Sequence, residues 1–131
     1  MSTSIKAGGA CNSLYAGLGA KGYDVVNYFT DGKPAQGKDS YTHEHAGVKW
    51  QFVSAEHREL FEADPAKYMP QYGGFCSWGV AAGKLFDVDP VNGWRIVDGK
   101  LYLNFNTDIQ KVFDQDPAGF ISRANVNWPK L

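Results

Sequence analysis

The sequence predicts an α+β domain in which two hairpin-plus-helix units, related by an internal duplication, pack around a shared aromatic core. The chain has 131 residues, of which 44% are hydrophobic and 15% are aromatic, so it is long enough for one domain with its own core. Residues 46–68 match residues 98–120 without a gap, at a constant offset of 52 positions. Each matched segment carries strand, turn and helix signals in that order.

The match between the two segments keeps a single register and preserves side-chain character. Trp50 aligns with Tyr102, and Leu60 aligns with Val112, so aromatic and aliphatic positions are retained. We therefore place one copy at about residues 41–70 and the other at about 94–121. The identical pairs are Gly47 with Gly99, Phe61 with Phe113, Asp64 with Asp116, Pro65 with Pro117, and Ala66 with Ala118.

The first copy begins with a predicted β-hairpin. Ala46 and Gly47 form the expected turn, since glycine tolerates the left-handed backbone that tight turns require. Val48, Trp50 and Phe52 then alternate with polar residues, as the inward face of a strand does.

A helix is expected after this hairpin. Ser54 is a favourable N-cap, and Glu56 places a negative charge in the first turn, where the helix dipole favours it. Leu60 and Phe61 are expected to face the core. Pro65 ends the helix, because the residue before a proline avoids the α region.

The second copy repeats this pattern. Residues 94–97 form a predicted strand, and Asp98-Gly99 is the strongest two-residue hairpin signal. Residues 101–105 form the return strand.

The helix of the second copy has its own start and stop signals. Asn106 or Thr107 is the expected N-cap, and Thr107 with Gln110 matches the capping-box pattern. The helix is expected to end by Asp116, because Pro117 follows.

The rest of the chain surrounds the two copies in a single domain over residues 22–131. The glycine-rich linker is of special interest, because glycine allows close backbone approach to a ligand. The flanking segments are an N-terminal tail (1–21), a short apolar run that fits a strand or a helix (22–29), a loop (31–40), the linker (71–93) and a C-terminal tail (122–131).

Composition and motifs exclude several function classes. The net charge is −1 and no run of basic residues is present, so we expect no nucleic-acid partner. No segment is apolar and long enough for a transmembrane span. No nucleophile elbow, zinc-protease motif or phosphate-binding loop is present, so an enzyme is the less favoured interpretation. The sequence does not determine the oligomeric state.

Several segments together resemble the YHS domain family, and more narrowly its exported bacterial YHS domain-containing (seleno)protein group. They are GYDVVNYF, AGVKWQFVSAEHRELFEADPAKYMPQYGG with Tyr41 before it and Cys76 after it, WRIVDGKLYLNFN, and NWPKL. The resemblance implies a small treble-clef-like scaffold and binding of a metal such as copper through cysteines. It also implies a periplasmic or cell-envelope location, with the export signal absent from this chain.

The sequence departs from the metal-binding pattern of that family. Asn27 stands near the first expected cysteine, and Val53 occupies a second ligand position. His57 occupies the position of a third cysteine and retains a ligating side chain. The usual cysteine site is therefore absent.

Four residues are the candidate ligands for copper or zinc: Cys76, His57, His45 and His43. Thiolate and imidazole suit either metal, and His43 and His45 share one strand face. Each residue also has a purely structural interpretation. Cys76 is then a small buried hydrophobe, His57 a hydrogen-bonded core histidine, and the other two a solvated strand face.

Two further alternatives remain open. In one interpretation the chain is a metal-handling protein. In the other it is a module that kept the YHS scaffold and lost its metal site, and it binds a small molecule or a partner segment through the aromatic residues around 72–78. Cys11 and Cys76 either pair in a disulfide or remain free thiols; thiol redox chemistry at Cys76 lacks a resolving partner.

Overall fold

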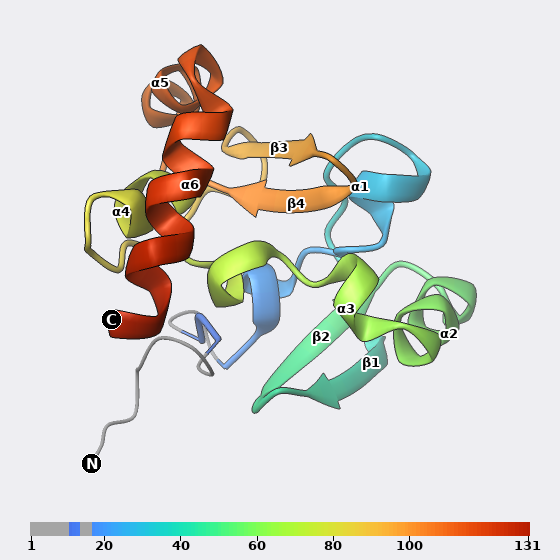
Figure 1. Cartoon of the computed structure of the whole chain (residues 1–131). Coiled ribbons are helices and arrows are strands. Elements are labelled where there is room, and N and C mark those ends of the chain that lie inside the picture. Colours follow the sequence, from blue (N-terminus) through green and yellow to red (C-terminus); the bar gives the residue numbers. More distant parts are fainter. Residues whose placement is uncertain (1–10, 14–16) are drawn as a thin grey trace.

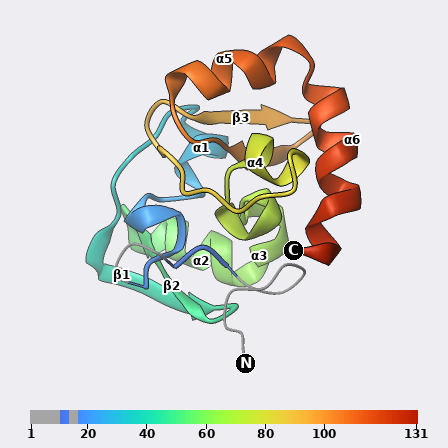
Figure 2. The same ribbon diagram turned by 90° about the vertical axis from the view of Figure 1, so that its left-hand side faces the viewer.

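A computed structural model describes residues 11–13 and 17–131. The fold is mixed α/β, with two small antiparallel hairpins, each followed by helices (Figure 1). The hairpins do not pair with each other but form separate two-stranded sheets. In a view turned by 90°, α5 (Thr107–Gln115) and α6 (Pro117–Asn127) lie against the second hairpin, and α2 (Ala55–Ala63) and α3 (Pro65–Tyr68) lie near the first (Figure 2).

The helices and strands follow one another in a repeated order. The strands are β1 (Lys38–His45), β2 (Val48–Phe52), β3 (Trp94–Val97) and β4 (Lys100–Leu103). The α-helices are α1 (Asn27–Thr30), α2 (Ala55–Ala63), α3 (Pro65–Tyr68), α4 (Ser77–Ala81), α5 (Thr107–Gln115) and α6 (Pro117–Asn127). Short 3-10 segments lie at Gly19–Gly22, Gln71–Gly74 and Trp128–Lys130.

Both predicted hairpin turns are present. Ala46 and Gly47 have φ values of 55° and 81°, and Asp98 and Gly99 have 53° and 75°. Two consecutive residues in the left-handed region are typical of the type I′ turn, whose twist matches that of paired strands. The register shifts once in the first hairpin, between Lys38 and Thr42, and remains regular in the second.

The helices after the hairpins begin as predicted. The Ser54 hydroxyl accepts the N–H of His57 at 3.2 Å, and the Asn106 side chain accepts the N–H of Ile109 at 2.8 Å. The capping box with Gln110 does not form, because Asn106 is the N-cap and position 110 is therefore one residue too far along. The return strand ends at Leu103 rather than at residue 105, since the chain turns there toward this cap.

Both helices end at an aspartate before a proline, as predicted. Asp64 has φ −155° and ψ 73°, and Asp116 has φ −157° and ψ 67°. Pro65 and Pro117 then begin new helices, α3 and α6, because proline fits the first helical position, where no N–H is needed. α6 continues to Asn127, so the segment from 122 onward is largely helical.

The conformational correspondence at an offset of 52 extends beyond the matched sequence. The turn at Gly19–Gly22 has its counterpart in Gln71–Gly74, and both contain two consecutive residues with positive φ. The turn is followed by α1 in one case and by α4 in the other. The apolar run at 22–29 therefore contributes a turn and a helix rather than a strand.

The core consists of two aromatic clusters. Trp50, Phe52 and Phe61 are fully buried in the first, which includes β2 and α2, and Phe113 is fully buried in the second. Truncation of any one of these aromatic side chains to alanine is expected to lower the free energy of unfolding by about 3–5 kcal/mol. Leu60 was predicted to face the core but is 38% exposed, because the buried face of α2 is the one that carries the neighbouring Phe61.

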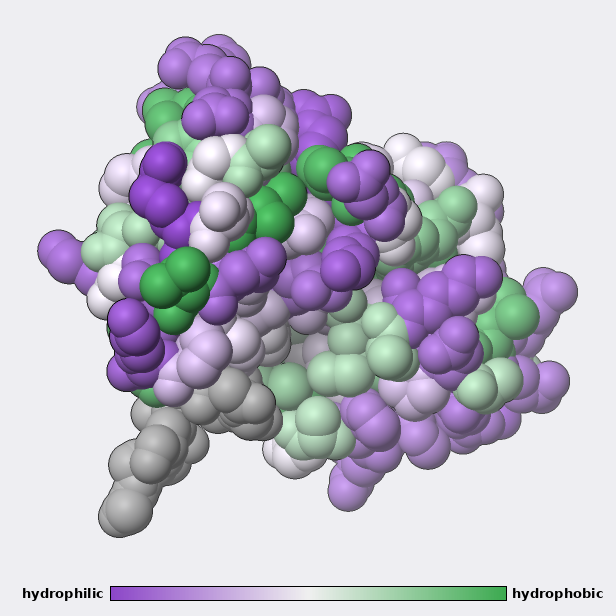
Figure 3. All heavy atoms as spheres, viewed as in Figure 1, coloured by the Kyte–Doolittle hydropathy of each residue, from purple (hydrophilic) through white to green (hydrophobic). Residues whose placement is uncertain are grey.

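The surface in the view of Figure 1 is mainly hydrophilic, with hydrophobic residues in small separate groups (Figure 3). Among the described residues, no helix is sufficiently long and apolar to span a bilayer. Cys11 and Cys76 are both buried free thiols.

Candidate functional site

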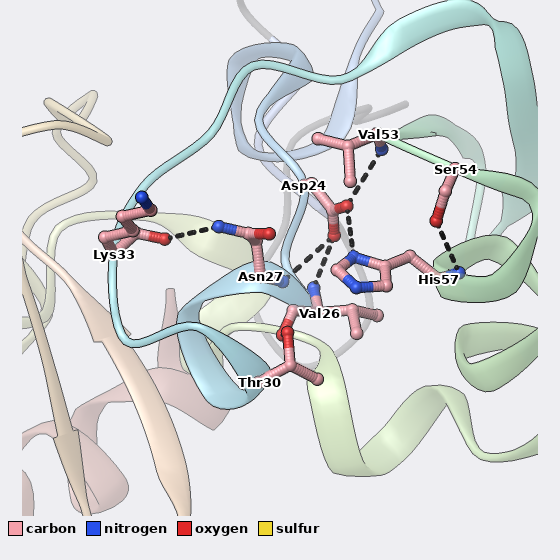
Figure 4. A network of polar contacts seen from close by, with 8 residues as sticks. All are labelled: Asp24, Val26, Asn27, Thr30, Lys33, Val53, Ser54 and His57. Carbon is pink, nitrogen blue, oxygen red and sulfur yellow. Dashed lines mark hydrogen bonds and ion pairs between the residues drawn. The ribbon is translucent and has the colours of Figure 1, made fainter.

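The side chain of His57 contacts a buried carboxylate from a different part of the chain. Its Nδ1 lies 2.7 Å from Oδ2 of Asp24, which is fully buried (Figure 4). A carboxylate accepts hydrogen bonds, so Nδ1 donates the proton in this contact. Asp24 also accepts the backbone N–H groups of Val26, Asn27 and Val53. His57 thus joins the start of α1 to the start of α2.

His43 and His45 lie together on β1, as predicted. Their rings are stacked with centroids 6.5 Å apart, and each ring makes a T-shaped contact with the ring of Phe61. His43 Nδ1 also pairs with Glu62 of α2 at 3.0 Å. His45 borders a hollow of about 460 Å³ at the first hairpin turn, which Gly17 also lines.

Cys76 is fully buried at the N-cap of α4. Its Sγ accepts the N–H of Gly79 at 3.4 Å, and the thiol lies 3.6 Å from Oδ1 of Asn104 as a donor. Burial raises the pKa of the Cys76 thiol, although hydrogen bonds from the backbone of Gly79, Phe105 and Trp78 act in the opposite direction. A protonated, enclosed thiol is a poor nucleophile and a poor metal ligand.

The four predicted ligands therefore lie in three different environments. His43 and His45 share one, while His57 and Cys76 each have their own hydrogen-bond partners. In the ranges 11–13 and 17–131, no group of three or more His, Cys, Asp or Glu side chains is arranged to hold a metal ion.

Asp24 and Cys76 occupy corresponding positions, 52 residues apart. The Asp24 carboxylate accepts backbone N–H groups at the start of α1, and the Cys76 sulfur accepts one at the start of α4. His57 and Ile109 correspond in the same way at the starts of α2 and α5. The same local frame therefore carries a hydrogen-bonded aspartate–histidine pair in the first half of the chain and a thiol with an aliphatic residue in the second.

A cavity of about 250 Å³ opens beside Ile109 in the second half. Its walls are mainly aromatic: the rings of Trp78 and Phe86 are stacked with centroids 6.2 Å apart, and Phe105 lies 6.1 Å from Phe86. Phe105 is 48% exposed, which is unusual for a phenylalanine. The full lining is Trp78, Phe86, Phe105, Asn106, Asp108 and Ile109; we call it the aromatic pocket.

The frame of the aromatic pocket is held by a buried amide. Asn104 is fully buried, accepts the N–H of Trp78 at 3.0 Å and donates to Gln110 at 2.8 Å. It thereby fixes α4 relative to α5. Gly79 leaves room for the wall, since a Cβ there would lie 2.7 Å from a ring carbon of Phe86.

Trp78 belongs to the aromatic segment for which the sequence suggested a pocket, whereas Tyr72 and Phe75 of that segment are buried in the second core cluster. Phe86 and Phe105 were not among the predicted site residues. No local signal marked Phe105, because a return strand over 101–105 places it on the same face as the core residues Leu101 and Leu103. The contact with Phe86 depends on the course of the linker, which composition does not specify.

No family model, curated protein or solved structure matches this chain.

Proposed function

We propose that the chain is a small non-enzymatic binding protein whose ligand occupies the aromatic pocket. One observation carries this proposal: three aromatic side chains, one of them 48% exposed, line an open cavity of about 250 Å³. Binding sites are concave and mostly apolar, with a few polar groups that orient the ligand. Asn106 and Asp108 provide such groups here.

An internal comparison supports a functional origin for the aromatic lining. We propose that the two halves arose by duplication of a hairpin-plus-helix unit, because their turns, caps and helix ends correspond at a constant offset of 52. At the positions of Trp78, Phe86 and Phe105, the first half has Val26, Pro34 and Val53. The unit therefore folds without aromatic residues at these places.

The proposal is tested with a thermal-shift screen of small metabolites on the wild-type chain, Phe105→Ala and Val53→Ala. Phe105 is a pocket wall, and Val53 is its counterpart in the first half and serves as the matched control. We expect ligands that stabilise the wild type and Val53→Ala but not Phe105→Ala. Equal stabilisation of all three proteins, or of none, would contradict the proposal.

A second candidate function is the handling of copper or zinc, and the orientation of His57 favours it. A metal-ligating histidine usually donates its other ring N–H to a carboxylate, and the 2.7 Å contact with Asp24 has this form. Nε2 of His57 would be the ligand atom. His43, His45 and Cys76 would have to approach it through a rearrangement of the chain.

Metal loading tests this second candidate. The protein would be incubated with Cu(I), Cu(II) or Zn(II), desalted and assayed for bound metal, together with His57→Ala and Cys76→Ser. One equivalent retained by the wild type and lost in His57→Ala would support it. Retention that is unchanged in both variants would reject it.

We further propose that the chain is a divergent member of the exported YHS group, with a treble-clef-like ancestry and an envelope location. The support is the resemblance of the segments around residues 22–29, 46–74 and 94–106 to that group. Fractionation of cells that express the full-length gene tests the location, and recovery only in the cytosolic fraction would contradict it.

A further inference from the structure

We infer that the ligand of the aromatic pocket is a small organic cation of the methylated-ammonium class. This inference rests on the proposed binding function and specifies its ligand. Two features of the described residues lead to it: a continuous wall of aromatic rings and an unpaired carboxylate at its rim.

Three neighbouring aromatic rings, those of Trp78, Phe86 and Phe105, line the cavity. Trp78 and Phe86 are nearly parallel, with an interplanar angle of 19°, and Phe105 is tilted by 52° against Phe86. The face of an aromatic ring carries partial negative charge and attracts cations, most strongly in the case of tryptophan. Three adjoining rings can therefore hold a cation that is itself partly apolar.

The carboxylate at the rim is that of Asp108, in the first turn of α5. Within the described part of the chain it makes no hydrogen bond or ion pair with another residue. The lining contains no lysine or arginine. The N-terminus of α5 contributes only about half a positive charge, so the full negative charge of Asp108 dominates.

The shape and polarity of the cavity select among cations. An inorganic ion requires several oxygen or nitrogen ligands, whereas this lining supplies mostly rings and the aliphatic side chain of Ile109. A methylated ammonium group has an apolar surface and loses little hydration on entering such a site. The volume of about 250 Å³ lies just below the usual small-molecule range of roughly 300–1,000 Å³, which fits a small head group.

Calorimetric titration with choline, and with its neutral isostere 3,3-dimethylbutan-1-ol, tests the charge requirement. The two probes have nearly the same shape and differ in the quaternary nitrogen. We expect choline to bind at least about tenfold more tightly than the alcohol, as a cation–π contribution with a nearby carboxylate predicts. Equal affinities, or tighter binding of the alcohol, would overturn the inference.

Two variants assign the effect to the pocket. Asp108→Asn is expected to weaken choline binding by about threefold to tenfold and to leave the affinity for the alcohol unchanged. Glu56→Gln is the matched control, because Glu56 occupies the corresponding position in the first turn of α2, and it should change neither affinity. Unchanged choline binding in Asp108→Asn would count against the inference.

The outcomes separate this inference from the function on which it rests. If choline does not bind but the metabolite screen yields ligands that need Phe105, the cationic class is wrong and the binding function stands. If neither choline nor any screened ligand depends on Phe105, both are rejected.

Discussion

At positions 46 and 98 the backbone adopts the same left-handed conformation but carries different side chains. Asp98 suits this conformation, because short polar side chains bond locally to the backbone, whereas Ala46 has no such compensation. Both residues are exposed at hairpin tips. The difference in side chain is thus a difference in local strain.

Ala46→Asn is therefore expected to stabilise the protein by about 1 kcal/mol, because asparagine tolerates the first position of a type I′ turn better than alanine does. Chemical denaturation of the wild type and the variant measures the change. Asp98→Ala is the reciprocal control and should destabilise by a similar amount. A destabilised Ala46→Asn would show that the turn at 46 and 47 is not the one described.

In the core, the side chain of Ser77 is a polar group at a place where an apolar one would fit. Its hydroxyl is buried and has no hydrogen-bond partner among the described residues, and the corresponding residue in the first half is Val25. We expect Ser77→Ala to increase the free energy of unfolding by about 1 kcal/mol, since an unpaired hydroxyl no longer has to be desolvated.

The matched control for Ser77 is Ser54→Ala. The hydroxyl of Ser54 caps α2, so its removal should cost about 1 kcal/mol. If both alanine variants were destabilised equally, the Ser77 hydroxyl would have a partner in solution.

At the scale of elements, local signals in the sequence predicted the two hairpins and the helices that follow them. Turn glycines, caps and the aspartate-proline pairs act within a few residues, so their effects are visible in sequence. α4 and α6 were not predicted as helices. α4 lies in a glycine-rich segment, and α6 packs against it through contacts between residues far apart in sequence.

An ion pair links β3 to α5. Arg95 donates two hydrogen bonds to Asp114 at 3.0 and 2.5 Å. The Arg95 guanidinium lowers the pKa of Asp114 below its ordinary value of 3.8, against a smaller effect of burial, and Gln110 assists through a further hydrogen bond. Both side chains are substantially exposed, so solvent screening limits the contribution of the pair to less than about 1 kcal/mol.

This pair has a predicted pH dependence. Because the folded-state pKa of Asp114 is lowered, its stabilisation is present above the unfolded pKa and is lost as the pH falls through the folded pKa. Asp114→Asn should therefore be slightly less stable than the wild type at pH 7 and equally stable in strong acid. Denaturation curves at several pH values test this. A difference that stays constant down to acid pH would contradict it.

At the scale of the whole molecule, the candidate site residues find their partners in distant parts of the chain, which local sequence signals do not predict. The sequence indicated His57 and Cys76, and the structure places each in its own network, with Asp24 and with Asn104. These partners lie 33 and 28 positions away, and nothing local marks them. The aromatic pocket likewise joins α4, the loop after it and the start of α5, so its existence depends on how the linker folds back.

The central claim is that ligands bind in the second half of the molecule, at the aromatic pocket. It is tested most directly by following the indole N–H signals of the four tryptophans by NMR while a ligand from the metabolite screen is added. Trp78 lines the pocket, whereas Trp50, Trp94 and Trp128 are not part of its lining. We predict that the Trp78 signal shifts with saturation and that the other three remain in place. Saturable shifts of Trp50, Trp94 or Trp128 with no change at Trp78 would contradict the account.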